Sequence, residues 1–460
     1  MSGSYPVIDR FSSRATKRTD RDVWHDLAVT IALLTLFMLA ARIFLGRGVS
    51  IGHLLALATL PVWISHLVRS GRGRLIVFFT LLALANGAWL TAYWASTHRI
   101  NDNEIWTNVA ELLSVAMIVG VFLWACTLTK VWVASTALGL GLVFSGVSRP
   151  ALFLENPWKY ALGLPIAALL LSLAMAFRKR TAEIFVLIIL AGASASMDSR
   201  SFFGVFAIGI LLTIWQMLPT RRRTTAVEVL LTVAALAFAV YVIGTTLLLE
   251  GYLGEAAQAR SVMQQELAGS VIVGGRPEMA ATAGLFLHNP IGFGPGTLVT
   301  PTELLAAKAG MRVIHYDPEN GWVNNYMFGT RIELHSSLGN LWAYWGFAGI
   351  AFAVVTLIIL IQRASIDLAE RSASALLIFT VMITAWNLAF NPTYSSLPYL
   401  ALALGLALVP RMSRGAPPDQ RPGDTTDVLP HDESGAATSA SANLSMVSGD
   451  GRRRASRSRR

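Results

Sequence analysis

The sequence has little charge for its length. Asp, Glu, Lys and Arg make up only 14% of the 460 residues, whereas a soluble globular domain contains about 25%. Apolar residues make up 54%, and the mean hydropathy is +0.54. A chain of this composition lacks the polar side chains that would cover a soluble surface. The composition therefore predicts an all-α polytopic membrane protein.

The sequence has only one cysteine and no glycine-rich nucleotide-binding motif. The single cysteine, Cys126, lies in an apolar run, which excludes a disulfide framework and any zinc or iron–sulfur site built from cysteines. Walker A and Rossmann glycine motifs are absent. The net charge of +10 comes mostly from short clusters between apolar runs and from the two tails. Such clusters are typical of membrane topology signals, so we expect no nucleic-acid partner.

Apolar runs near the length that crosses a bilayer, about 20 residues, occur about twelve times. The runs lack the alternation of strands, so we expect about twelve transmembrane helices. The predicted spans are 27–45, 51–68, 75–95, 108–128, 131–147, 159–177, 182–198, 202–218, 226–248, 338–361, 373–390 and 396–410.

Lys and Arg gather in every second connection between these spans. Cytoplasmic connections are enriched in these residues, so we expect a multi-pass protein with both termini in the cytoplasm. Examples of the basic connections are Arg69 to Arg74, Arg178 to Arg180 and Arg221 to Arg223.

The connection 249–337 is much longer than the others, at about ninety residues, and falls on the outer side of this topology. Helix-compatible stretches at 254–266, 277–287 and 302–309 predict a folded external cap. At the C-terminus, 411–460 is rich in small and basic residues, which predicts a disordered tail. The predicted divisions are an N-terminal cytoplasmic segment 1–26, transmembrane helices 1–9 in 27–248, the external loop 249–337, transmembrane helices 10–12 in 338–410 and the basic cytoplasmic tail 411–460.

Two arginines on the predicted outer side are candidates for a functional role. Arg200 lies at the boundary of the membrane, where a charge is costly, and it opposes the positive-inside bias. It pairs with Asp198, reaches a lipid phosphate, or binds an anionic substrate, because a guanidinium suits phosphate oxygens. Arg276 precedes Pro277, which is favoured in the first turn of a helix, so the helix dipole would add to its attraction for an anion. A surface loop arginine is the alternative.

His335 directly precedes the tenth predicted span. A histidine there either accepts a proton at neutral pH or is a structural residue at the interface. The nearest acid in the sequence is Glu333, and no carboxylate is adjacent to the histidine. The loop 249–337 contains no His-x-Glu, His-x-x-x-His or Asp-x-Asp pattern, so we expect no metal.

Four features occur in order along the chain: Ser199-Arg200, Arg276 before a helix, the run His288-Asn-Pro-Ile-Gly-Phe-Gly-Pro-Gly296, and His335 followed by Gly346 and Gly349. Together these features resemble the O-antigen ligase and O-antigen polymerase superfamily of bacterial envelope glycosyltransferases. The resemblance covers roughly residues 185–360. Ser336 and Tyr344 depart from the family pattern, which often has Asn and an acidic residue there.

The resemblance implies a GT-C-like membrane glycosyltransferase of the cytoplasmic membrane that acts on the outer face without metal or other cofactor. Its donor would be a glycan linked through pyrophosphate to a polyprenyl lipid. Its acceptor would be a hydroxyl of another glycan or lipid-linked glycan. In that role Arg200 and Arg276 bind the pyrophosphate and His335 is the base. We expect inversion at the anomeric carbon, because no carboxylate nucleophile is placed beside the histidine. Glu333, two residues away, is the alternative nucleophile.

Two alternatives remain open. A lipid-linked glycan flippase or other transporter would have a similar number of spans, but such proteins tend to have two similar halves and polar residues at mid-membrane. A polyprenyl-phosphate-sugar transferase usually has acidic residues in its first external loop, and Arg47 to Ser50 contains none. The motifs do not distinguish a ligase from a polymerase.

Overall fold

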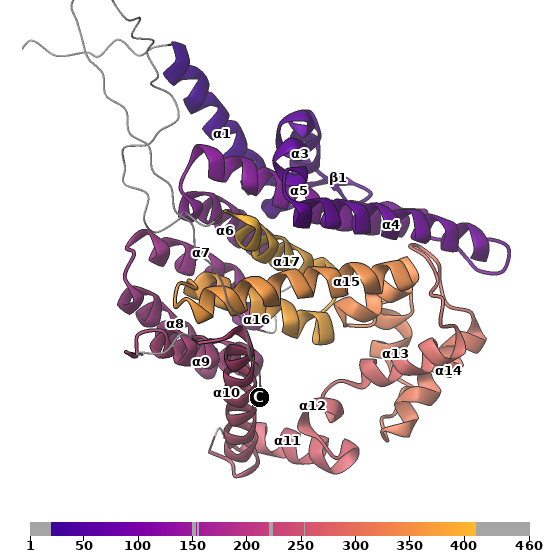
Figure 1. Ribbon diagram of the computed structural model, residues 1–460. Coiled ribbons are helices and arrows are strands. Elements are labelled where there is room, and N and C mark those ends of the chain that lie inside the picture. The colour runs from indigo at the N-terminus through magenta and orange to yellow at the C-terminus, as the bar shows by residue number, and fades with distance from the viewer. Residues whose placement is uncertain (1–19, 150–152, 154–155, 220–223, 253, 411–460) are drawn as a thin grey trace, which may run out of the picture. The chain divides into compact units, whose positions relative to one another are not determined.

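A computed structural model describes residues 20–149, 153, 156–219, 224–252 and 254–410 (Figure 1). These ranges are mostly helical, and their only strands are the short antiparallel pair β1 (Phe44–Gly46) and β2 (Val49–Ser50). The predicted tail 411–460 and the basic cluster Arg221 to Arg223 lie outside the described residues.

The first half of the chain forms helices at all nine predicted spans of 27–248. Side-chain caps define several helix starts: Ser70 Oγ, for example, accepts a hydrogen bond from the Gly73 backbone at the start of α4. The elements are α1 (Asp20–Ala41), α2 (Ile51–Ala58), α3 (Leu60–Val68), α4 (Gly71–Trp94), α5 (Asp102–Leu128), α6 (Val131–Val147), the π-helical η2 (Trp158–Leu162), α7 (Gly163–Ala176), α8 (Arg180–Ser196), α9 (Arg200–Trp215) and α10 (Ala226–Leu249).

Six helical segments in the described ranges are long and apolar enough to cross a membrane, and a seventh is added if α2 and α3, bent by 77°, count as one span. The six are α1, α4, α5, η2 with α7, α10 and the later helix α15 (Ser337–Ala369). This composition and length show a helical membrane protein. The remaining predicted spans coincide with shorter helices, so the full number of crossings stays a prediction.

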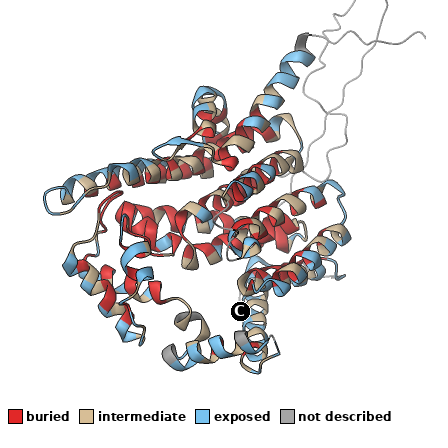
Figure 2. Ribbon diagram, turned by 180° about the vertical axis from the view of Figure 1, so that it is seen from behind, coloured by how far each residue is buried: buried red, intermediate tan, exposed pale blue. Residues whose placement is uncertain are grey.

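The last three helices lie among the others. α15 packs against α4, α16 (Ala375–Phe390) and α17 (Thr393–Leu408), and α17 packs against α5. Most residues of α16 and α17 are buried, as the red ribbon in Figure 2 shows. A helix that is apolar on all faces is stable when other helices surround it, which explains the central place of these two short helices.

The long connection is folded and contains the helices that its sequence predicts. α11, α13 and α14 fall on the predicted stretches 254–266, 277–287 and 302–309, each extending at most four residues beyond them. The elements of this segment are α11 (Glu255–Ala268), α12 (Val271–Gly274), α13 (Pro277–His288), α14 (Pro301–Val313) and the π-helical η3 (Trp322–Met327).

A glycine-rich turn fastens this segment to the bundle. The backbone N–H groups of Phe293 and Gly294 both donate to the carbonyl oxygen of Ala343 in α15, at 2.8 and 3.0 Å. Opposite the turn, α15 bends at Gly346, whose φ of +56° favours glycine. A Cβ there would lie 2.6 Å from both Asn86 Nδ2 and the Ile291 carbonyl oxygen. The turn and the bend therefore fit together only because Gly346 has no side chain.

Candidate functional site

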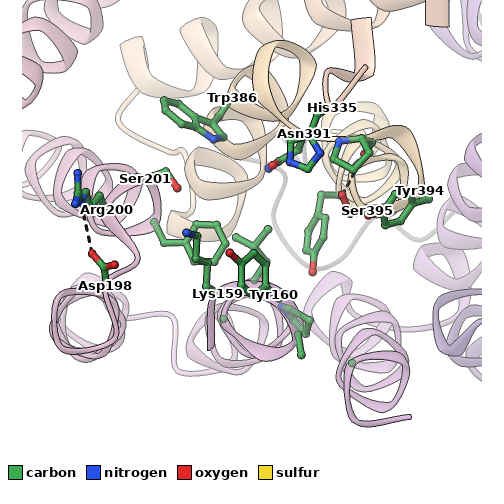
Figure 3. Close-up of a pocket in the computed structure, with 18 of the residues that line it drawn as sticks. Lys159, Tyr160, Asp198, Arg200, Ser201, His335, Trp386, Asn391, Tyr394 and Ser395 are labelled. Atoms are coloured by element: carbon green, nitrogen blue, oxygen red, sulfur yellow. Dashed lines mark hydrogen bonds and ion pairs between the residues drawn. The ribbon is translucent and has the colours of Figure 1, made fainter. Parts of the chain in front are cut away.

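The three residues singled out in the sequence, Arg200, Arg276 and His335, line one cavity of about 620 Å³. Figure 3 shows Arg200 on one side of it and His335 on the other. Its volume falls within the range of about 300–1,000 Å³ that is usual for ligand sites. Six basic side chains and two acidic ones line it, which favours an anionic ligand. They are Arg42, Arg149, Lys159, Arg200, Arg260 and Arg276, with Asp198 and Glu278.

Arg200 is the first residue of α9, and it does pair with Asp198, as one reading of the sequence predicted. Its Nε lies 3.5 Å from Asp198 Oδ1, and its Nη1 donates to Ser261 Oγ at 2.9 Å. Asp198 also accepts a 2.8 Å hydrogen bond from Arg260. Although partial burial acts in the opposite direction, the hydrogen bond and charge of Arg260 and the charge of Arg200 lower the pKa of Asp198. One carboxylate thus pairs with two arginines.

Arg276 precedes α13 at its N-cap position, as predicted, with Pro277 in the first turn. Its guanidinium carbon lies 5.7 Å from the ring centroid of Phe390, and it forms no ion pair with any described residue. Burial lowers the pKa of Arg276, while the charge of Glu278 acts in the opposite direction. Arg276 is thus held beside an aromatic ring, near Glu278 but without an ion pair to a described residue, and is well placed to bind an anion from outside the chain.

Glu278 is a carboxylate that the sequence did not point to. Its Oε1 accepts a 3.1 Å hydrogen bond from Trp322 Nε1, and its Oε2 is buried with no hydrogen-bond partner among the described residues. Burial raises the pKa of Glu278. The expectation of no carboxylate near the histidine is therefore incomplete, because Glu278 lines the same cavity as His335. Glu278 and His335 are far apart in the sequence, and only the fold of the long connection brings both to one cavity.

The backbone of His335 is held in a left-handed conformation, with φ +49°. Its N–H donates to Glu333 Oε1 at 3.1 Å, and the same oxygen accepts a 2.9 Å hydrogen bond from Asn340 Nδ2. Asn340 Oδ1 in turn accepts from the Leu334 N–H at 3.0 Å. Burial raises the pKa of Glu333 to about 7, against the charge of Arg331. Glu333 does not line the cavity, so its role is to position the histidine.

The His335 ring contacts aromatic side chains of the long connection. Its Nδ1 lies 3.2 Å from the Tyr326 hydroxyl, which is 3.4 Å from the Tyr394 hydroxyl. The Trp322 ring lies edge-on at 5.6 Å between ring centroids. Burial, together with the charge of Arg276, lowers the pKa of His335 to about 4. The imidazole is therefore neutral at pH 7, in the form that accepts a proton.

Four further cations of the cavity were not predicted. Arg42 lies near the end of the predicted span 27–45, Arg149 follows the span 131–147, and Lys159 begins the span 159–177, all on the same side as Arg200. The rule that singled out Arg200 would therefore also have found these three residues. Arg260 carries no such signal, since it lies in a polar segment where a basic residue is common. Among the described residues, no group of three His, Cys, Asp or Glu side chains is arranged to hold a metal.

No protein-family model, curated protein or solved structure matches this chain. A function can therefore be inferred only from the chemistry of the cavity and the motifs of the sequence.

Proposed function

We propose that this protein is a membrane glycosyltransferase. It would transfer a glycan from a polyprenyl-pyrophosphate donor to a hydroxyl of a glycan or lipid-linked glycan, on the outer face of the cytoplasmic membrane, as in the O-antigen ligase and polymerase superfamily. About twelve crossings and a GT-C-like fold belong to the same proposal. The observation that carries it is that Arg200, Arg276 and His335, far apart in the chain, line one cation-rich cavity.

The charges of the cavity suit the departure of a pyrophosphate. When the bond between the anomeric carbon and the pyrophosphate oxygen breaks, negative charge develops on the leaving group, and fixed cations stabilise it. Arg276 is available for this role because it has no ion pair with a described residue. Arg200 is oriented by Asp198 and Ser261.

His335 is the base of the proposed reaction. The acceptor oxygen forms a bond to the anomeric carbon while its proton passes to the neutral imidazole. This single displacement inverts the anomeric configuration. A double displacement would need a carboxylate nucleophile. Of the two in the cavity, Asp198 pairs with arginines, so a product with retained configuration would assign the first step to Glu278 instead.

The proposal predicts that His335→Asn abolishes transfer, since asparagine tolerates the left-handed backbone but is not a base. The experiment uses a strain depleted of this protein and complemented with wild-type or variant chains, from which lipid-linked glycans are extracted and sized. The matched control is His315→Asn, because His315 has a similar φ of +60° in the same segment and does not line the cavity.

Each outcome has a defined meaning. Single lipid-linked repeat units that persist with His335→Asn and disappear with His315→Asn would indicate a polymerase, and full-length lipid-linked chains would indicate a ligase. Glycans that gather on the cytoplasmic leaflet would contradict transfer and favour the flippase. Complementation by His335→Asn at the wild-type level would remove the histidine from the reaction.

A further inference from the structure

We propose that the cavity contains a second anion subsite, built by Arg149 and Arg42, that binds a phosphate or pyrophosphate group of the acceptor. This inference rests on the proposed glycan transfer and deepens it, because it makes the acceptor an anionic, phosphate-bearing glycan rather than a neutral one.

Arg149 is the unexplained charge. It directly follows the C-cap of α6, is half-buried and lines the cavity. Its side chain forms no ion pair or hydrogen bond with any described residue. Among the described residues, the charge of Glu111 favours the Arg149 cation, but Glu111 is bonded to Arg42, so the partly buried guanidinium loses hydration without forming a bond of its own to them. An anionic ligand would supply the missing partner.

Arg42 lies beside Arg149 but is already partly neutralised. Its Nη2 donates to Glu111 Oε1 at 2.8 Å, and its Nη1 donates to the backbone carbonyl oxygen of Tyr394. These two bonds fix the orientation of the Arg42 side chain. The carboxylate of Glu111 neutralises the charge of one of the two arginines. The pair therefore keeps about one net positive charge, and two guanidinium groups in one place suit the several oxygens of a phosphate.

The proposed subsite adjoins His335 from the side opposite Arg200. Arg42 is bonded to the backbone of Tyr394, whose hydroxyl lies 3.4 Å from that of Tyr326, and Tyr326 contacts His335. In Figure 3, Tyr394 and His335 are on one side of the cavity, while Arg200 and Asp198 are on the other. A donor pyrophosphate at Arg200 and Arg276 and an acceptor phosphate at Arg149 would therefore flank the proposed base.

The binding experiment uses the full-length protein in nanodiscs of neutral lipid and counts bound inorganic pyrophosphate by equilibrium dialysis. We expect two sites in the wild type and one in Arg149→Gln and in Arg276→Gln. Arg47→Gln is the control, because Arg47 is an exposed residue of the nearby β1–β2 hairpin that does not line the cavity, and it should keep two. One site in the wild type, unchanged in Arg149→Gln, would overturn the proposal.

Anionic phospholipid distinguishes the sources of the phosphate. If nanodiscs with phosphatidylglycerol abolish the Arg149-dependent site alone, a lipid headgroup occupies it and the acceptor role is wrong. If the site persists, the phosphate of a glycan acceptor is supported.

A transfer assay separates this inference from the proposed function. We expect Arg149→Gln to raise the KM for a phosphate-bearing acceptor about tenfold while the KM for the donor stays unchanged. Transfer that is equally efficient to neutral and phosphorylated acceptors in wild type and Arg149→Gln would overturn the inference and leave the function standing. Two bound pyrophosphates without any transfer would contradict the function and leave the anion subsite standing.

Discussion

At the scale of single residues, the position of His335 depends on two neighbours that do not touch the cavity. Glu333 accepts hydrogen bonds from the His335 backbone and from Asn340, and so stabilises a left-handed histidine that would otherwise cost about 1–2 kcal/mol. Nearly complete burial makes the ionised form of Glu333 unfavourable. The same carboxyl therefore orders the site and couples its stability to pH.

Stability should respond to pH through Glu333. Its folded pKa, about 7, is above the ordinary 4.5, so protonated Glu333 favours the folded state. That contribution is complete below pH 4.5 and is lost as the pH rises through 7. Glu333→Gln removes the titration, so the variant should gain stability relative to wild type between pH 5 and pH 8, by up to about 3 kcal/mol. Thermal unfolding in detergent at several pH values measures this, and a difference independent of pH would contradict it.

Transfer should remain fast in mild acid because His335 stays neutral until about pH 4. Protonation of a solvated histidine would instead reduce the rate with a midpoint near 6.5. Since the positive charge of Arg276 contributes to the lowered pKa, Arg276→Gln should move the acid limb to higher pH, in addition to weakening donor binding. Initial rates from pH 3.5 to pH 8 measure the pH at which the rate falls in acid. A wild-type midpoint near 6.5 would mean that the imidazole is not buried as described.

At the scale of elements, the bend of α15 determines where the long connection is attached. Trp345 O, at the bend, accepts a 2.8 Å hydrogen bond from Asn86 Nδ2 of α4, and Ala343 O, one turn earlier, accepts from the glycine-rich turn. The N-terminal end of the same helix follows His335 directly. A substitution that alters the bend should therefore displace both the glycine-rich turn and His335.

Gly346→Ala should lower the free energy of unfolding by about 1–3 kcal/mol or more. The added Cβ would overlap neighbouring atoms, and the φ of this residue is positive. The matched control is Gly192→Ala in α8, where an added Cβ meets nothing within 4 Å. That change should be neutral or stabilising by up to about 1 kcal/mol. Thermal unfolding of both variants tests the difference, and equal effects would show that the bend is not required.

At the scale of the whole molecule, helix length decides which helices can cross the hydrocarbon layer without help from neighbouring helices. α16 and α17 have 16 residues each and so extend about 24 Å, less than the hydrocarbon thickness of about 30 Å. Both are surrounded by other helices over most of their surface. A short helix can cross a bilayer when protein rather than lipid surrounds its ends. Length alone therefore does not exclude α16 and α17 as crossings, and the proposal of about twelve crossings includes them.

The orientation proposed for the bundle can be tested because Cys126 is the only cysteine. In a Cys126→Ala background, Ala309→Cys in α14 should react with a membrane-impermeant maleimide in intact cells. Gly71→Cys, at the start of α4, should react only after permeabilisation. Both positions are exposed. The reverse pattern, or labelling of both in intact cells, would contradict the predicted topology.

The sequence predicted those residues whose local setting is unusual. Arg200 stood out because a cation opposed the charge bias, and Arg276 because a proline marked the helix that follows it. Glu278 lies in the first turn of α13 and Arg260 lies in the polar helix α11, places where a charged residue is common, so no local pattern marked them. They line the cavity because of how α11 and α13 pack. Local sequence patterns carry no information about that packing.

By itself, the sequence determined the membrane class and the positions of the helices, because hydrophobic length and capping are local properties of the chain. Only the tertiary structure decided that six basic side chains line one cavity. It also decided that Asp198 pairs with both Arg200 and Arg260, and that burial keeps His335 neutral. Burial and charge act over distances of several ångströms in space rather than along the chain. The chemistry of the site therefore emerges only when distant segments are packed together.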